Sequence, residues 1–204
     1  MRRHPRLAAI LELVPSGLLV IDVGADHGHI SGALPRVITT ERHPHQARRR
    51  GLRWVVADGL APFREVPCAV IAGMGARTIE AILSRGPAPA VAVLHAPDDP
   101  PRLRRWLAAN GWRIDAESLA PEARRYAEVL RVVPGEEPAT GLTLAVGPRL
   151  LSEGHPLLEA HLTQLLGHHR SLAAATAGVA PDKHREAQRW VEFLVEALEV
   201  RRVL

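Results

Sequence analysis

The stretch that decides the fold reads Leu18-Leu19-Val20-Ile21-Asp22-Val23-Gly24-Ala25-Asp26-His27-Gly28-His29-Ile30. It opens with four consecutive apolar residues, a pattern typical of a strand buried on both faces in a parallel sheet. A turn that contains glycine and aspartate follows, and a strand, a glycine turn and a helix form the nucleotide-binding corner of a doubly wound sheet. Asp22 and Asp26 make this turn unusual, because two carboxylates repel a diphosphate but suit a positively charged ligand.

Strand and helix patterns alternate along the next part of the chain. Buried strands are expected at residues 37–40, 54–57, 69–72 and 90–94. Helices are expected at residues 5–14, 28–34, 43–50, 75–84 and 100–109. This alternation predicts an α/β fold with a parallel sheet and right-handed crossovers. An antiparallel hairpin of residues 112–119 and 125–133 is expected at one edge of the sheet, followed by a short extended piece at 143–146.

The last part of the chain has a helical pattern. Leucines recur at helical spacing from Leu158 to Leu172, and a second apolar stripe runs from Trp190 to Leu198. The segment Gly178–Pro181 separates the two stripes, so we expect an αα-hairpin. The predicted domains are residues 1–150, which hold the sheet, and residues 151–204, which hold the hairpin.

Composition limits the class of protein. The 204 residues carry a formal net charge of +4, and arginine supplies nearly all the positive charge because Lys183 is the single lysine. An arginine-rich surface favours phosphate partners, although a merely solvated surface explains it equally well. Cys68 is the single cysteine, which excludes a disulfide framework and a thiolate metal site. Glu12 interrupts the apolar start, so we expect no signal peptide. No apolar run approaches the length that a bilayer requires, so we expect no membrane segment and a cytoplasmic location.

Each of four predicted strand ends carries residues suited to a ligand. They are Asp22, Gly24, Asp26 and Gly28 after the first strand, Glu41 after the second, Asp58 and Gly59 after the third, and Ala72, Gly73, Met74 and Gly75 after the fourth. Ligands of open α/β sheets bind at the carboxyl ends of the strands, and an acid after the second strand commonly holds ribose hydroxyls. For any single acid, a helix cap or a solvated turn is the alternative interpretation.

Several motifs give the chain a family resemblance. In chain order they are Asp22–His27, Ala57–Leu60, Ile71–Gly75, Arg104–Ile114, Glu122–Val129 and Gly147–Leu151. With them the chain resembles the bacterial tRNA (adenine(22)-N1)-methyltransferases over nearly its whole length. The resemblance implies a class I methyltransferase (Rossmann-like) sheet with a C-terminal αα-hairpin that helps to hold tRNA. It also implies transfer of a methyl group from S-adenosylmethionine, whose sulfonium is positively charged, to N1 of an adenine.

Site residues follow from the strand ends and the resemblance together. The predicted cofactor-binding residues are Asp22, Gly24, Asp26, His27, Glu41, Asp58, Gly59, Ala72 and Gly73. The predicted catalytic residues are Asp26 and Met74, and Asp26 is expected to stabilise the positive charge that develops on the methylated base. We expect a monomer without a metal ion.

The chain departs from the family pattern in a few places. The segment between Glu41 and Trp54 is short, and His95-Ala96-Pro97-Asp98 stands where the family usually has Gln-Pro-Asn. These departures favour an alternative in which a decayed methyltransferase only binds RNA. A second alternative is a nicotinamide-dependent dehydrogenase, but the first loop lacks the Gly-x-Gly-x-x-Gly pattern of such enzymes.

Residues outside the strand ends have plainer interpretations. Cys68 is expected to be a buried packing residue rather than a nucleophile. Four histidines of the two expected hairpin helices are expected to lie on solvated helix faces, and they are His161, His168, His169 and His184. Three groups of arginines are candidate phosphate contacts, and they are Arg48–Arg50, Arg102 with Arg104 and Arg105, and Arg170 with Arg185 and Arg189.

Overall fold

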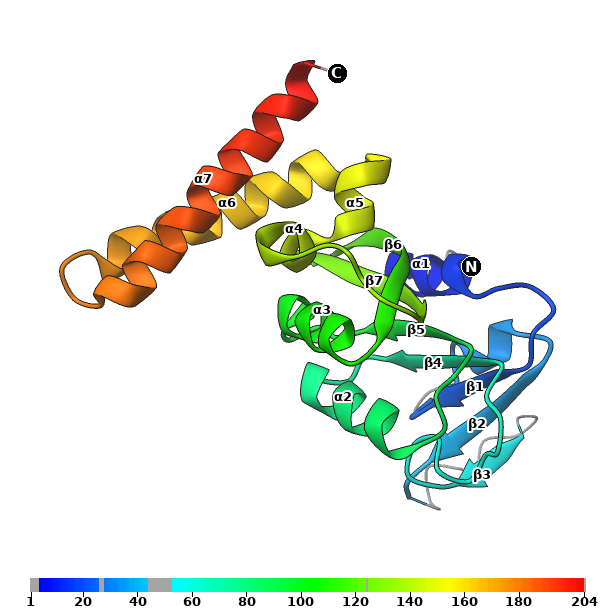
Figure 1. The fold of residues 1–204 in the computed structure, drawn as a ribbon. Coiled ribbons are helices and arrows are strands. Elements are labelled where there is room, and N and C mark those ends of the chain that lie inside the picture. Colours follow the sequence, from blue (N-terminus) through cyan, green and yellow to red (C-terminus); the bar gives the residue numbers. More distant parts are fainter. Residues whose placement is uncertain (1–3, 26–27, 44–52, 124, 204) are drawn as a thin grey trace.

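The computed structural model describes residues 4–25, 28–43, 53–123 and 125–203. Its centre is a seven-stranded sheet in the order β3-β2-β1-β4-β5-β7-β6 (Figure 1). The strands are β1 (Val20–Val23), β2 (Val37–Glu41), β3 (Trp54–Val56), β4 (Cys68–Ala72), β5 (Val91–His95), β6 (Trp112–Glu122) and β7 (Arg125–Pro134). The first five strands are parallel to one another, and β7 is antiparallel to both of its neighbours.

Strand β1 lies at the point where the strand order reverses. All four of its residues are buried, as the apolar run predicts. Val20 pairs with Val37 of β2 on one side and with Cys68 of β4 on the other. The carboxyl ends of β1 and β4 therefore open into a crevice, the usual ligand position in such sheets.

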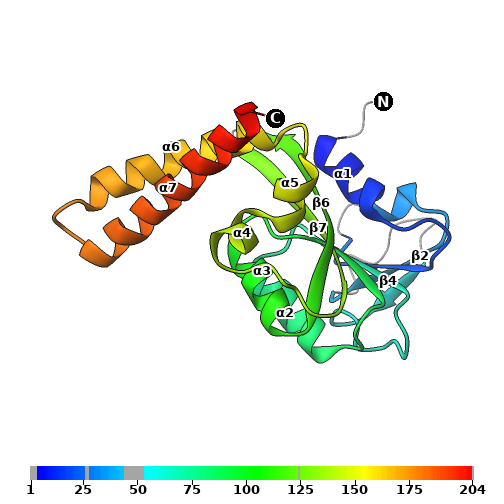
Figure 2. The ribbon, with the colours of Figure 1, turned by 45° about the horizontal axis from the view of Figure 1, so that its top comes forward.

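Helices cover both faces of the sheet. Helix α1 (Pro5–Leu13) and the 3₁₀ turn η1 (Ser31–Ala33) lie on one face, and α2 (Ala76–Arg85) and α3 (Pro100–Ala109) lie on the other (Figures 1 and 2). A large apolar core between the sheet and α2–α3 contains Ile79 and Leu103, and a smaller core under α1 contains Ile10. The predicted doubly wound α/β sheet and the antiparallel edge hairpin are confirmed.

Two local predictions are wrong. The helix expected at residues 28–34 is only the turn η1, because β2 follows too soon for a longer helix and Pro35 interrupts it. The extended piece expected at 143–146 is the short helix α4 (Gly141–Val146), since a brief apolar run does not by itself distinguish a buried helix from a strand. The helix expected at 43–50 falls almost wholly outside the described residues.

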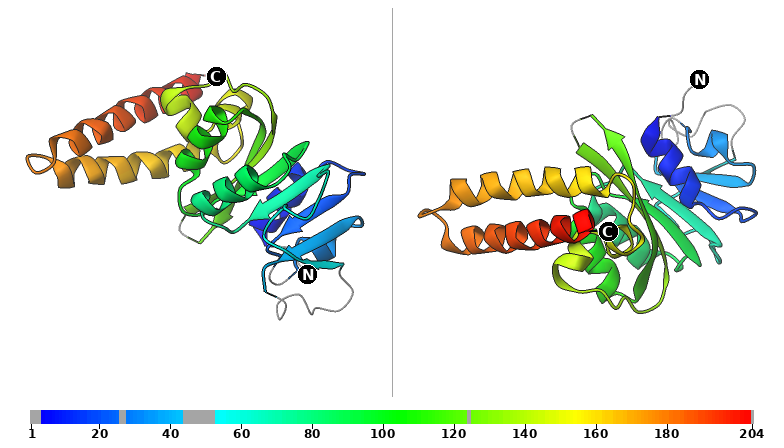
Figure 3. Two further views of the ribbon diagram at one scale, coloured as in Figure 1. Left: turned by 60° about the horizontal axis from the view of Figure 1, so that its bottom comes forward. Right: turned by 90° about the horizontal axis from the view of Figure 1, so that it is seen from above.

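The C-terminal hairpin projects away from the sheet (Figure 3). It consists of α6 (Leu158–Thr176) and α7 (Pro181–Val203), which pack through an apolar seam that includes Leu162 and Leu194. Helix α5 (Pro148–Glu153) joins it to the sheet domain, so the predicted boundary between residues 150 and 151 falls inside this helix. Within the described parts of the chain, no helix is both long enough and apolar enough to cross a membrane.

Candidate functional site

A cavity of about 340 Å³ lies at the carboxyl ends of the strands; we call it the strand-end cavity. Its walls come from the ends of β1 and β2, the loops after β3 and β4, and one face of α2. Five predicted site residues line it together, and they are Gly24, Glu41, Asp58, Gly59 and Met74. Residues that lie far apart in the sequence thus meet at one edge of the sheet.

The two carboxylates of this cavity lie in different surroundings. Glu41 ends β2 and is 6% exposed. Asp58 lies at the mouth, where its carboxylate oxygens are 4.0 Å from Arg42 Nε and 3.8 Å from Arg85 NH1. Arg77 also lines the wall, so positive and negative side chains share the cavity. The negative charge that a cation would meet is concentrated at Glu41.

Two glycines give the cavity its shape. Gly24 has a φ of +67°, and a Cβ built on it would overlap the terminal methyl of Met74. Gly59 has a φ of +63°, and its Cβ would lie 3.0 Å from Ile82 Cγ2. A larger residue at either position would strain the backbone and intrude on its neighbour.

One buried polar atom in the cavity has an unmet hydrogen-bonding capacity. Thr40 is 1% exposed and lines the wall beside Glu41. Within the described residues, Thr40 Oγ1 has no hydrogen-bond partner. A buried hydroxyl without a partner is costly unless a ligand or water supplies one. Together with the two carboxylates, this hydroxyl fits a ligand rich in hydroxyl and amino groups, such as a nucleoside.

Three further predicted residues that the structure describes do not line the cavity, and they are Asp22, Ala72 and Gly73. The Asp22 carboxylate is buried on the η1 side of β1, where it accepts a hydrogen bond from Ser31 Oγ, which is in turn 2.9 Å from Thr39 Oγ1. Burial is the largest influence on Asp22 and raises its pKa to about 6. The Asp22 carboxylate therefore faces away from the cavity, and the hydrogen bond from Ser31 holds η1 against β1.

The loop after β4 lies beside the cavity. Ala72 is the last residue of β4 and pairs with His95, and the Gly73 amide donates to the His95 carbonyl at 3.0 Å. Met74 is the residue of this loop that reaches the cavity wall. Asp26 and His27 lie outside the described residues.

Comparison with known proteins assigns the chain to a family. The family model described as TrmK, tRNA (adenine(22)-N(1))-methyltransferase, matches residues 45–200. The chain belongs to this family. A curated relative, the tRNA (adenine(22)-N(1))-methyltransferase of Bacillus subtilis, is 26% identical over 98% of this chain and 98% of its own length. The family predicted from the sequence is therefore confirmed.

Solved structures agree with this assignment. The crystal structure of Streptococcus pneumoniae Sp1610 in complex with S-adenosyl-L-methionine has a TM-score of 0.76 at 25% identity, with 95% of this chain and 98% of that chain covered. The Bacillus subtilis M1A22 tRNA methyltransferase TrmK has a TM-score of 0.79 at 22% identity, with 97% and 99% covered. The fold is that of a class I methyltransferase, and the comparisons favour this enzyme class over a dehydrogenase or a decayed RNA-binding protein.

Three interpretations of residues outside the strand ends are settled by burial. Cys68 is fully buried and burial raises its thiol pKa to about 11, which agrees with a packing role. Arg104 is not a surface phosphate contact, because it is fully buried in a network of ion pairs. His161 is 3% exposed, so the solvated-face interpretation is wrong for this residue.

Helix periodicity could not reveal the position of His161, since its face of α6 packs against the start of β7, far away in the sequence. Across the described residues, no three His, Cys, Asp or Glu side chains lie close enough together to hold a metal ion.

Proposed function

We propose that this protein transfers the methyl group of S-adenosylmethionine to N1 of an adenine in tRNA. The observation that carries the proposal is the meeting of Glu41, Asp58 and the glycine-shaped loops in one cavity of a chain that belongs to the tRNA (adenine(22)-N(1))-methyltransferase family. Membership of this family indicates methyl transfer to N1 of a tRNA adenine. The cavity supplies side chains suited to holding the methyl donor.

The strand-end cavity suggests which residues hold the donor. Glu41 would accept hydrogen bonds from ribose hydroxyls, and Asp58 would accept one from the adenine amino group. Thr40 would find the partner that its hydroxyl lacks. The predicted contacts of Asp22, Asp26, His27, Ala72 and Gly73 remain part of the proposal, with Asp22 acting through the segment that Ser31 anchors.

The chemistry required of the protein is mainly orientation. Bound S-adenosylmethionine supplies an electrophilic methyl group on a sulfonium. The lone pair of adenine N1 forms the new N–C bond while the S–C bond breaks, and sulfur keeps the bonding electron pair. Because the methylated base becomes a cation, a carboxylate beside it would stabilise the transition state more than the ground state. We assign that role to Asp26. We assign to Met74 the role of forming the part of the strand-end cavity wall that lies next to Gly24.

Contact with tRNA would involve exposed arginines. Arg105 of α3, Arg170 of α6 and Arg189 of α7 are all exposed. If such residues contact phosphates, raising the salt concentration from 50 to 200 mM should weaken tRNA binding steeply, because each neutralised phosphate releases counterions. A flat salt dependence of the Kd would contradict this assignment.

The decisive experiment identifies the product. The protein would be incubated with bulk tRNA and S-adenosylmethionine carrying a labelled methyl group, and the digested nucleosides would be separated by mass spectrometry. The expected product is labelled 1-methyladenosine. Another methylated nucleoside, or none despite binding of S-adenosylhomocysteine, would overturn the proposal. A cytoplasmic location, a monomeric state and independence from metal ions stay predictions.

A further inference from the structure

A second cavity lies where the hairpin meets the sheet domain; we call it the joint cavity. Its volume is about 500 Å³. The segment after β5, the start of β7, and the helices α6 and α7 line it. Among the residues that the structure describes, none lines both this cavity and the strand-end cavity. The family's methyl donor therefore does not account for it.

Ring side chains form much of the wall of the joint cavity. Tyr126 and His161 meet edge to face with ring centroids 5.7 Å apart. His169 stacks on Trp190 with centroids 4.5 Å apart and an interplanar angle of 4°. Such walls favour a planar aromatic ligand, because bases stack on aromatic side chains with little regard to sequence.

His161 has ring nitrogens available for a ligand. Although it is 97% buried, neither nitrogen has a hydrogen-bond partner within the described residues, and its Nε2 lies 3.6 Å from Glu128 Oε1. Burial is the main cause that lowers its pKa, so the ring is neutral near pH 7 and can both donate and accept. His169 Nδ1 is likewise buried and unpartnered. A buried polar group without a partner is costly, and the edge of a base would satisfy it.

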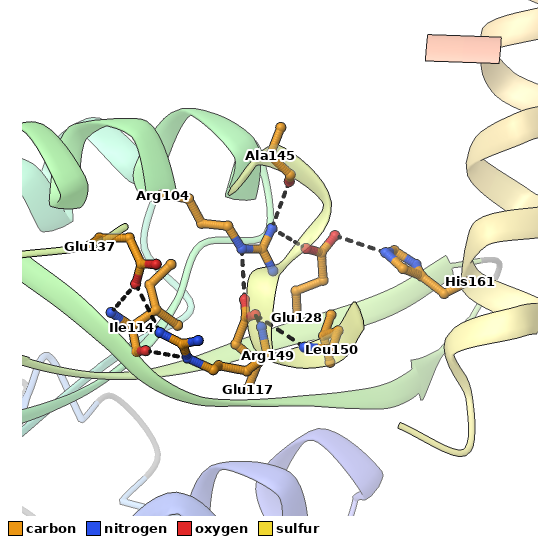
Figure 4. Close-up of polar contacts among 9 residues, drawn as sticks. All are labelled: Arg104, Ile114, Glu117, Glu128, Glu137, Ala145, Arg149, Leu150 and His161. Carbon is orange, nitrogen blue, oxygen red and sulfur yellow. Dashed lines mark hydrogen bonds and ion pairs between the residues drawn. The ribbon is translucent and has the colours of Figure 1, made fainter. Parts of the chain in front are cut away.

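A buried ion-pair network positions His161 relative to the sheet (Figure 4). Glu128 Oε2 accepts from Arg104 NH1 at 2.6 Å, and Arg104 also donates to Glu117 at 2.7 Å and to the Ala145 carbonyl at 3.0 Å. These contacts connect α3, β6, β7 and α4. The cavity wall is therefore held in place before any ligand binds, which reduces the entropy cost of binding.

The rim of the joint cavity suits a nucleotide. Arg125 is exposed and donates from NH1 to the Pro97 carbonyl at 2.7 Å, which fixes a guanidinium that has further donors for a phosphate. Asp98 and Asp99 also line this cavity, and each carboxylate already accepts a backbone hydrogen bond, Asp98 from the Ala76 amide and Asp99 from the Arg102 amide. Rings, unpartnered nitrogens and a fixed arginine together match a base with its phosphate.

Resting on the proposed tRNA methyltransferase function, we propose that the joint cavity receives an unstacked base of the tRNA other than the adenine that is methylated. The methylated adenine must reach the donor in the strand-end cavity. Between the two cavities, Asp98 Oδ1 accepts a hydrogen bond from the Ala76 amide at 2.9 Å, which ties the loop after β5 to the start of α2. The second base would set the register of the tRNA on the enzyme, since RNA recognition commonly uses splayed bases stacked on aromatic side chains.

The first test compares binding by variants. His161→Phe keeps a ring and removes the nitrogens, Tyr126→Leu removes a stacking surface, and Gln188→Ala is the control on an exposed position of α7 outside the cavity. At fixed salt, the first variant should raise the Kd for tRNA roughly fivefold and the second roughly tenfold or more. The control should not change it. The Kd for S-adenosylhomocysteine, measured by calorimetry, should stay unchanged in all three.

The second test uses the unaltered protein and so does not depend on how the variants fold. Chemical probing of the Watson–Crick edges of tRNA, with and without protein, should show altered reactivity at a base other than the adenine found methylated by mass spectrometry. His161→Phe should remove that change. The inference is overturned if only the methylated adenine responds, or if folded variants bind tRNA as the parent does. If the parent neither binds nor methylates tRNA, the proposed function itself fails.

Discussion

The terminal methyl group of Met74 occupies the space into which any side chain at Gly24 would extend. Gly24 also has a φ of +67°, which costs a residue with a Cβ about 1–2 kcal/mol. Gly24→Ala should therefore lower the free energy of unfolding by that amount and push Met74 into the strand-end cavity. Calorimetry should show affinity for S-adenosylhomocysteine that is weaker by roughly tenfold, or about 1.4 kcal/mol.

A double substitution separates the two effects. Met74→Ala in the Gly24→Ala background removes the overlap and leaves the backbone strain. Ligand affinity should recover in the double variant while the loss of stability persists, which a double-mutant cycle measures directly. If Gly24→Ala and the double variant bind S-adenosylhomocysteine with equal affinity, the alanine at position 24 does not push Met74 into the strand-end cavity.

Glu41→Gln tests the carboxylate at the end of β2. Removing the charge should weaken S-adenosylhomocysteine binding by about 1.5–3 kcal/mol, the usual value of a hydrogen bond to a charged group. Glu65→Gln is the matched control, because Glu65 is exposed in the loop before β4 and does not line the cavity. If both variants bind the ligand alike, Glu41 does not hold it.

Arg104 and Arg102 lie on the same helix and should differ greatly in their effect on stability. Arg104→Leu leaves the buried Glu117 and the largely buried Glu128 without their cation, which should cost about 3–5 kcal/mol. Arg102 is 41% exposed and pairs with Glu80, so Arg102→Ala should change the stability little, because solvent screens an exposed ion pair. Thermal unfolding should show a decrease in Tm of roughly 6–20 °C for the first variant. Similar Tm values for both would contradict this account of the network.

Asp22 should make stability depend on pH in a defined window. Its pKa is about 6 in the folded protein and 3.8 in a model compound, so ionisation destabilises the fold as the pH rises through this range. Relative to the parent, Asp22→Asn should gain about 3 kcal/mol between acid and neutral pH. Below about pH 3 the Asp22 carboxyl is protonated in both the folded and the unfolded protein, and any remaining difference reflects packing alone. Denaturant unfolding from about pH 3 to 8 measures the change; a constant difference would contradict the assignment.

The strand-end cavity was largely predictable because parallel strands bring their carboxyl ends to one edge. An apolar run followed by glycine and an acid therefore locates Gly24, Glu41 and Asp58 without any three-dimensional information. The sequence does not show which way a side chain on a strand points. Asp22 alternates to the opposite face of β1 from the wall of the cavity and meets Ser31 there.

The buried network of Arg104 was not predictable from local patterns. Its carboxylate partners come from β6 and β7, and nothing in the spacing along α3 distinguishes Arg104 from the exposed Arg105 beside it. His161 is similar, since it is buried where α6 docks against the start of β7. Long-range packing decides the role of such residues, and a single sequence carries little information about it.

The burial of Cys68 has a practical value for biophysical work. Since this single native thiol is sealed inside the sheet and resists ionisation, thiol-directed dyes should leave it unmodified while the protein is folded. Val179 is 82% exposed at the tip of the hairpin, so Val179→Cys would then supply the single thiol that reacts with the dye. A fluorophore attached there could report how the hairpin approaches RNA in a protein that is otherwise unaltered.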